Sequence, residues 1–92
     1  EAFAREKIIK ELIRACEKRD VGYERIEEIA SAIEKSLYNE MTREVSAKKI
    51  GDMIMKRLRE LDEVAYIRFA SVYLNFKEVS EFAKEVKTLI NK

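Results

Sequence analysis

Residues 61–73 read LDEVAYIRFASVY, a run whose apolar side chains would surround most of a helix instead of lining one side of it. Asp62 is the second residue of this run and precedes its apolar part, and Asp is one of the residues preferred at a helix N-cap. A helix at the surface of a protein carries a single apolar stripe, whereas a buried helix is apolar nearly all round. We therefore expect a helix from Glu63 to Leu74 at the centre of a helical bundle.

The rest of the chain repeats its apolar residues at helical spacing. This pattern predicts further helices over about residues 3–18, 23–38 and 47–61, and a fifth that starts at the capping-box-like pair Asn75 and Glu78. The apolar stripe of the first helix is expected to contain Ile8, Ile9, Leu12, Ile13 and Cys16, and that of the second Ile26, Ile29, Ala30, Ile33 and Leu37. Gly22 is expected either to leave helical geometry or to stand as the N-cap of the second helix. The prediction is an all-α, compact bundle of about five helices, forming one domain over residues 1–92.

Composition argues against catalysis and against a membrane segment. The chain has no histidine, which removes the usual general base and the commonest metal ligand. Its one cysteine, Cys16, falls on the apolar stripe of the first helix, so we expect a buried, inert thiol and not a nucleophile. Nineteen basic and eighteen acidic residues leave a net charge of +1, too little for strong attraction to nucleic acid. No apolar run approaches the roughly 20 residues that span a bilayer. We expect a cytoplasmic protein that is not an enzyme and holds no metal.

Two residues depart from this ordinary helical pattern. Gly51 lies inside a predicted helix, where glycine costs about 1 kcal/mol relative to alanine. Close packing of another helix is the favoured explanation, and a ligand approaching the backbone is the alternative. Arg68 is the only basic residue of the central helix, so we expect it to pair with a carboxylate or to reach a polar pocket, the ion pair being favoured.

Aromatic residues recur three or four positions apart at Tyr66, Phe69, Tyr73 and Phe76. Such a stripe is usually part of a core. The alternative is an aromatic wall against which a nucleobase packs, and Tyr73 suits that role best because its ring ends in a hydroxyl group.

Residues 61–73, followed by Phe76 and Phe82, resemble the signature of the ATP-cone domain in the bacterial repressor family of ribonucleotide reductase genes. Other matching pieces occur in the family's order, namely REK at 5–7, ACEKR at 15–19, REVS at 43–46, and IG at 50–51. The resemblance spans essentially the whole chain. It implies a regulatory domain that binds ATP or dATP and changes its oligomeric state, and thereby controls operator binding by the repressor.

The resemblance also implies a nucleotide site at Glu1, Lys7 and Tyr73. Lys7 lies near a helix N-terminus, a region favourable to phosphate oxygens. Glu1 is suited to accept a hydrogen bond from an adenine amine or a ribose hydroxyl. Without the family, Glu1 and Lys7 would be read as solvated surface residues. The site requires the first and fourth helices to lie side by side, so that Lys7 and Tyr73 border one purine-nucleotide cavity.

Some family features are missing from this sequence. The family carries a four-cysteine zinc ribbon that binds DNA, and a β-hairpin that closes over the nucleotide, ahead of the region that this chain covers. Ala2 replaces a usual proline, and Ala4 replaces a usual Asp or Asn N-cap. We therefore expect DNA binding only through a zinc ribbon not present here, a homo-oligomer, and weakened nucleotide affinity. Two alternatives remain: a helical interaction module that has lost nucleotide binding, and the regulatory cone of a reductase subunit.

Overall fold

Five α-helices make up the part of the chain that the computed structural model describes, residues 5–39, 47–75 and 78–91. In chain order they are α1 (Arg5–Ala15), α2 (Tyr23–Asn39), α3 (Ala47–Leu61), α4 (Glu63–Tyr73) and α5 (Val79–Ile90). Those residues contain no strand, and the all-α class is confirmed. The predictions that fall on Glu1, Ala2, Ala4 and Phe76 lie outside the described residues.

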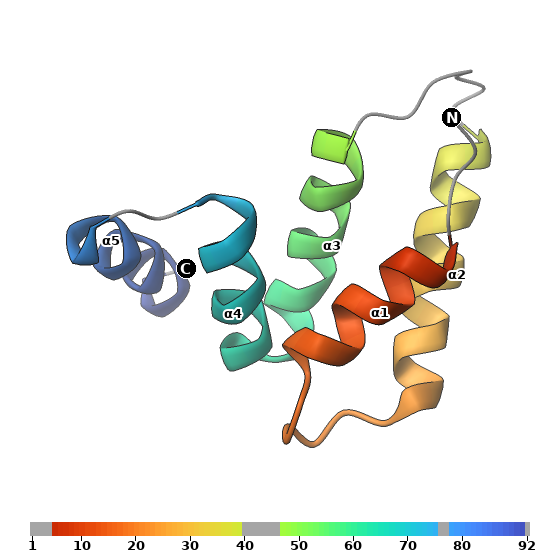
Figure 1. The fold of residues 1–92 in the computed structure, drawn as a ribbon, viewed down its shortest axis with the longest axis horizontal. Coiled ribbons are helices and arrows are strands. Elements are labelled where there is room, and N and C mark those ends of the chain that lie inside the picture. The colour runs from red at the N-terminus through yellow and green to blue at the C-terminus, as the bar shows by residue number, and fades with distance from the viewer. Residues whose placement is uncertain (1–4, 40–46, 76–77, 92) are drawn as a thin grey trace.

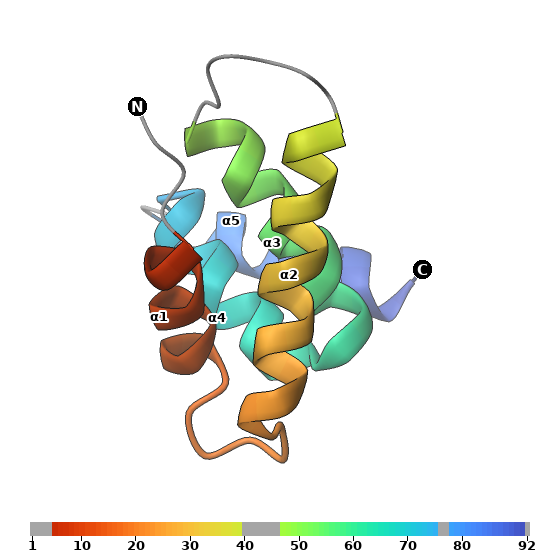
Figure 2. The ribbon, with the colours of Figure 1, turned by 90° about the vertical axis from the view of Figure 1, so that its right-hand side faces the viewer.

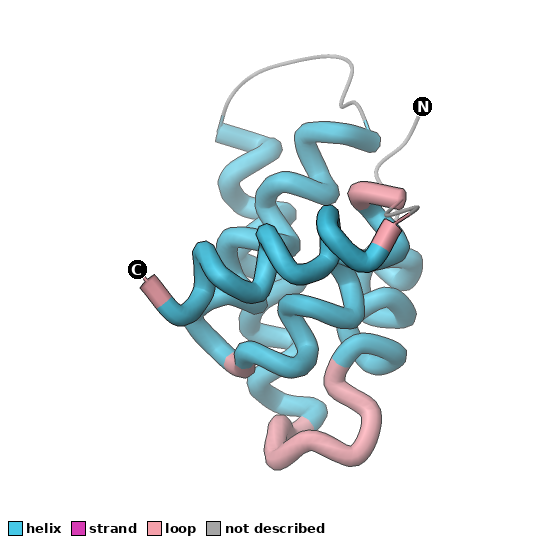
Figure 3. The backbone as a smooth tube through the Cα atoms, turned by 90° about the vertical axis from the view of Figure 1, so that its left-hand side faces the viewer, coloured by secondary structure: helices cyan, strands magenta, loops and turns pink. Residues whose placement is uncertain are grey.

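The helices wrap around α4, which packs against α1, α3 and α5 (Figure 1). From the side in Figure 2, α2 stands in front and α1 lies beside it. Figure 3 gives the opposite side, where the helix leading to the C-terminus crosses the front of the molecule. The packing of α1 against α4 meets the first requirement of the predicted site, that these two helices be neighbours.

The core is formed almost entirely by α1 to α4 and the residue that follows α1. All the apolar residues predicted for α2 are buried, and α5 contributes one residue. The buried residues are Ile8, Leu12, Ala15, Cys16, Ile26, Ile29, Ala30, Ile33, Leu37, Ile54, Leu58, Ala65, Tyr66, Phe69, Ala70 and Leu89. The inert role predicted for Cys16 agrees with this burial. Burial is the main cause that raises the pKa of the Cys16 thiol, and the nearby charge of Asp62 adds to it.

The central position of α4 is confirmed, but one side of the helix is open. Val72 is 74% exposed and Val64 is also exposed. Ile13, predicted to join the apolar stripe of α1, is exposed as well. The physical reason is helical geometry: at about 100° per residue, Ile13 lies roughly 100° from Leu12, the fully buried residue of α1.

Both ends of α4 are set by short polar residues. Asp62 is extended, and its carboxylate accepts a hydrogen bond of 2.9 Å from the Ala65 N–H, so the predicted N-cap is confirmed. Beyond the last turn, Asn75 has a φ of 56°, a left-handed conformation that Asn adopts more readily than most residues. The predicted capping box is therefore wrong. Asn75 terminates α4, while Glu78 precedes α5 without making a side-chain cap.

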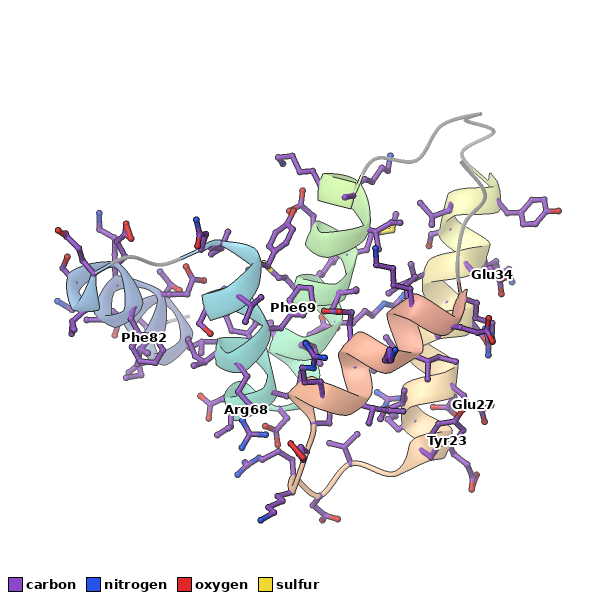
Figure 4. The ribbon with its side chains drawn as sticks, in the orientation of Figure 1. Tyr23, Glu27, Glu34, Arg68, Phe69 and Phe82 are labelled. Carbon is purple, nitrogen blue, oxygen red and sulfur yellow. The ribbon has the colours of Figure 1, made fainter. Side chains whose placement is uncertain are left out.

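The contacts of Arg68 differ from the ion pair that the sequence favoured. Its Nη1 donates hydrogen bonds to the backbone oxygens of Ala15 (3.1 Å) and Glu17 (2.6 Å), and no carboxylate of the described residues pairs with it. Figure 4 shows Arg68 beside the end of α1. A cation is favourable there because the final carbonyls of a helix carry partial negative charge. Lys18 follows with a φ of 60°, and α1 ends at Ala15 instead of near Lys18.

The connection between α1 and α2 resolves the two roles considered for Gly22. The Gly22 carbonyl accepts hydrogen bonds from the backbone N–H groups of Arg25 (3.1 Å) and Ile26 (3.3 Å). Gly22 therefore stands at the start of α2, and Lys18 adopts the left-handed conformation in this connection.

Candidate functional site

Tyr73, the last residue of α4, lies across the first turns of α3. A Cβ atom added at Gly51 would overlap its ring, and even Cδ1 of Tyr73 would be only 2.8 Å away. On the α4 side, the ring stacks on Phe69 with centroids 5.6 Å apart and an interplanar angle of 18°. Phe69 is labelled in Figure 4. Gly51 is thus explained by helix packing, the alternative that the sequence favoured.

The Tyr73 hydroxyl reaches polar groups on α3. It lies 2.7 Å from the backbone oxygen of Lys48 and 3.1 Å from Oδ1 of Asp52, and can donate its one proton to either. Asp52 in turn accepts a hydrogen bond of 3.0 Å from Nζ of Lys48, one turn earlier on the same helix. Tyr73, Lys48 and Asp52 therefore form one polar network at the edge of the α3–α4 contact.

This network fixes the charge state of each member. Hydrogen bonds from Lys48 and then Tyr73 lower the pKa of the Asp52 carboxyl. The hydrogen bond to Asp52 raises the pKa of the Lys48 ammonium. Desolvation, followed by the hydrogen bond to Asp52, raises the pKa of the Tyr73 phenol. At neutral pH the phenol stays protonated and able to donate, beside a carboxylate and an ammonium.

The outer face of α3 continues this region as a basic surface. Lys48, Lys49 and Lys56 line a shallow open hollow together with Asp52 and Met53. The first turn of α3 contains no acidic residue. Basic side chains beside the positive end of a helix dipole repel it but attract anions. This surface is therefore more favourable to an anion than the chain's net charge of +1 suggests.

Lys7 lies on a different face of α1 from the residues that contact α2. Arg5 is fixed to α2 by hydrogen bonds to Ser31 (3.0 Å) and Glu34 (3.2 Å). Two residues later, the helix has turned by about 200°, so Lys7 points away from the α2 side. Lys7 is exposed and has no hydrogen bond or ion pair with the described residues.

The three predicted site residues therefore have different outcomes. Tyr73 occupies the α3–α4 contact, Lys7 is a solvated cation on α1, and Glu1 lies outside the described residues. No hydrogen bond joins Lys7 to Tyr73, whose hydroxyl contacts Lys48 and Asp52, and a shared nucleotide cavity stays a prediction. Sequence reasoning missed Lys48 and Asp52. Their signal was an acid–base pair four residues apart that brackets Gly51, but such pairs are common on helix surfaces.

Other kinds of site find little support in residues 5–39, 47–75 and 78–91. Within these ranges no group of three histidine, cysteine, aspartate or glutamate side chains is arranged to hold a metal ion. None of the helices described there has the length and apolar character needed to cross a membrane.

Comparison with known proteins gives consistent matches. The family model for the ATP cone domain matches residues 1–79. The chain is 50% identical over 92 residues to the transcriptional repressor NrdR of Clostridium acetobutylicum, covering all of this chain and 61% of the relative. It is 48% identical to the NrdR of Acetivibrio thermocellus (99% and 60% covered) and 51% identical to that of Geobacillus kaustophilus (100% and 60%). The chain thus spans about three-fifths of these relatives.

Proposed function

The chain belongs to the ATP cone domain family, and we propose that it is the nucleotide-sensing regulatory domain of a transcriptional repressor. The family match carries this proposal because it covers α1 to α4 completely, and with them both described residues of the predicted site. The relatives at about 50% identity are transcriptional repressors, which favours a regulatory role over a catalytic one.

We propose ATP or dATP as the ligand, bound by Glu1, Lys7 and Tyr73. Lys7 offers an exposed ammonium near the N-terminus of α1, where the helix dipole also favours phosphate. One face of the Tyr73 ring is stacked on Phe69 and its edge lies over Gly51. Because its hydroxyl proton is donated to α3, Tyr73 can offer the ligand the hydroxyl oxygen as a hydrogen-bond acceptor. This assigns recognition of polar atoms to Tyr73 and of phosphate to Lys7.

The same proposal extends to the whole repressor. Nucleotide binding by this domain would change its oligomeric state, and the oligomeric state would control repression of ribonucleotide reductase genes. DNA contact in this scheme belongs to a zinc ribbon that the 92 residues do not include. The domain proposed here is the single unit over residues 1–92, placed in the cytoplasm.

An interaction module without nucleotide binding is the second candidate, and the exposure of α5 favours it. Val79 and Ile90 are 83% and 71% exposed, an unusual position for the apolar residues of a helix. The third candidate, the regulatory cone of a reductase subunit, receives less support because the matched relatives are repressors.

Isothermal titration with ATP and with dATP tests the first candidate, on the 92-residue chain and on the full-length gene product. Lys7→Ala is expected to weaken binding at least about tenfold, roughly 1.4 kcal/mol. Lys84→Ala is the matched control, because Lys84 is an exposed lysine on α5. Absence of both heat and thermal stabilisation with either nucleotide would refute the proposal and leave the interaction module.

A further inference from the structure

The last helix leaves most of its apolar stripe uncovered. Of the apolar residues that recur along α5, only Leu89 is buried. At about 100° per residue, Phe82 lies on the same side of the helix as Leu89 and faces the body of the molecule. Figure 4 shows Phe82 on α5. The residues on the outer side of the stripe are Val79, Ala83, Val86 and Ile90.

These four outer residues have the spacing of a coiled-coil seam. They follow one another at intervals of four, three and four residues, which places them in one line along the helix. Val79, Ala83 and Ile90 are exposed, and Val86 is half-buried. An exposed line of apolar residues at this spacing is the surface that a second helix packs against.

We propose that this outer seam pairs with the same seam of a second copy of the chain, with the two α5 helices antiparallel. The intervals of four, three and four read the same in both directions. A two-fold axis therefore places Val79 opposite Ile90 of the second copy, and Ala83 opposite its Val86. A parallel pair would place Ala83 opposite Ala83 and leave that layer underfilled.

Charge agrees with the antiparallel arrangement. Lys87 is the charged residue that directly borders the outer seam, and the antiparallel register places it opposite Ser80 of the second copy. Glu81 and Lys84 lie on the far side of the helix. No two like charges face each other across the pair, and the antiparallel helix dipoles attract.

The location of α5 in the comparisons supports a role in assembly. The ATP cone match ends at residue 79, where α5 begins, whereas the repressor from C. acetobutylicum aligns over all 92 residues. Ala83, Val86 and Ile90 of the seam thus lie beyond the matched cone but within the region shared with repressors. A regulatory role for this pairing rests on the nucleotide-controlled oligomerisation proposed above. The pairing itself does not depend on nucleotide.

The size of the seam sets the expected strength. A 12-residue helix is about 18 Å long, so four seam layers bury far less than the roughly 1,000 Å² of a stable interface. The pair is therefore weak by itself, and dimers form reversibly as the concentration rises.

Sedimentation equilibrium from about 10 μM to about 1 mM, a range that suits weak interfaces, tests the pairing. The native chain should dimerise, and the double variant Val79→Glu/Ile90→Glu should raise the dissociation constant at least about tenfold. Both side chains are more than two-thirds exposed, so the melting temperature should stay the same. Lys84→Gln is the control. It changes the net charge by −1, as each glutamate substitution does, but on the far side of α5, so this variant should dimerise like the native chain. A native chain that stays monomeric, or a double variant that associates equally well, would overturn the inference.

Disulfide trapping tests the direction of the pair. Chains carrying Val79→Cys and Ile90→Cys are mixed and oxidised, while the native Cys16 stays buried. The mixed 79–90 disulfide should exceed both symmetric disulfides, and predominance of 79–79 or 90–90 would contradict the antiparallel arrangement. If another segment of the full-length gene product covers the seam, the introduced thiols of its monomer will resist labelling, which also overturns the inference. Titration of the Val79→Glu/Ile90→Glu variant with ATP separates this result from failure of the nucleotide proposal.

Discussion

Gly51 and Tyr73 show how one missing side chain on α3 positions an aromatic ring of α4. The ring occupies the space that a Cβ at Gly51 would need. It is held there by its stacking on Phe69 and by its hydroxyl contact with the Lys48 carbonyl. Glycine costs a helix about 1 kcal/mol relative to alanine. The packing of the Tyr73 ring over Gly51 must therefore stabilise the fold by more than this cost.

Gly51→Ala is therefore expected to destabilise the protein, although alanine is the better helix former. Moving the ring should lower the free energy of unfolding by about 1–3 kcal/mol. In a Tyr73→Ala background the clash disappears, and Gly51→Ala should then be neutral or stabilising by up to about 1 kcal/mol. Urea unfolding followed by circular dichroism measures both. Equal effects of Gly51→Ala in the two backgrounds would show that the ring is not the obstacle.

At the scale of single helices, α4 depends on Asp62 at its start. The Asp62 carboxylate accepts a hydrogen bond from the Ala65 N–H. Nε of Arg19 also donates to its two oxygens, each 3.0 Å away, and this pair ties the α1–α2 connection to α4. Burial opposes ionisation of Asp62, but the hydrogen bonds from Ala65 and Arg19 outweigh it, and the pKa of the carboxyl is lowered. The charged form therefore stabilises the folded state.

Asp62→Asn should reveal this charge through pH. Asparagine preserves a cap acceptor, so the variant should lose under about 1 kcal/mol at pH 7, and Asp62→Ala about 1–2 kcal/mol. Because the folded pKa is depressed, the stabilisation is complete above the unfolded value of about 3.9 and is lost as pH falls through the folded pKa. The stability difference between native chain and Asp62→Asn should thus shrink below about pH 4. A difference that persists unchanged to pH 2 would exclude a titrating Asp62 as its source.

At the scale of the whole molecule, α5 joins the core formed by the other four helices through two hydrogen bonds and one buried residue among the contacts described. The Tyr66 hydroxyl donates a hydrogen bond to Glu85. Arg59 lies 5.6 Å from the centroid of the Tyr66 ring and donates to the Thr88 carbonyl at 2.9 Å. Leu89 is the one buried residue of α5. The molecule is therefore expected to open first at this helix.

Tyr66→Phe tests this order of opening, because it removes the bond to Glu85 and preserves the ring. The loss of about 1 kcal/mol should speed amide hydrogen exchange in Val79–Ile90 roughly fivefold, with little change in the slowest amides of α1 to α4. Ser71→Ala is the control, since the Ser71 hydroxyl bonds to Arg68 O within its own helix. A uniform acceleration in all helices would mean that α5 opens only when the whole domain unfolds.

The amino-acid sequence alone determined the number and order of the helices in the described residues, the cap at Asp62 and the burial of Cys16, and it pointed to the family. These features depend on residue periodicity and on neighbours a few positions away, which are readable in one chain. The open side of α4 and the exposure of Ile13 were not readable in this way, because apolar spacing does not say how many neighbours a helix acquires.

Only the tertiary structure decided which residues contact one another across helices. The carbonyls that Arg68 binds, the polar contacts of Tyr73 with Lys48 and Asp52, and the uncovered face of α5 all depend on how helices cross. Asn75 was assigned to the wrong helix because the same residue type caps one helix and terminates another, and only the path of the chain distinguishes the two. Contacts between residues more than 20 positions apart have no local signature, because they arise from packing geometry and not from the preferences of either residue.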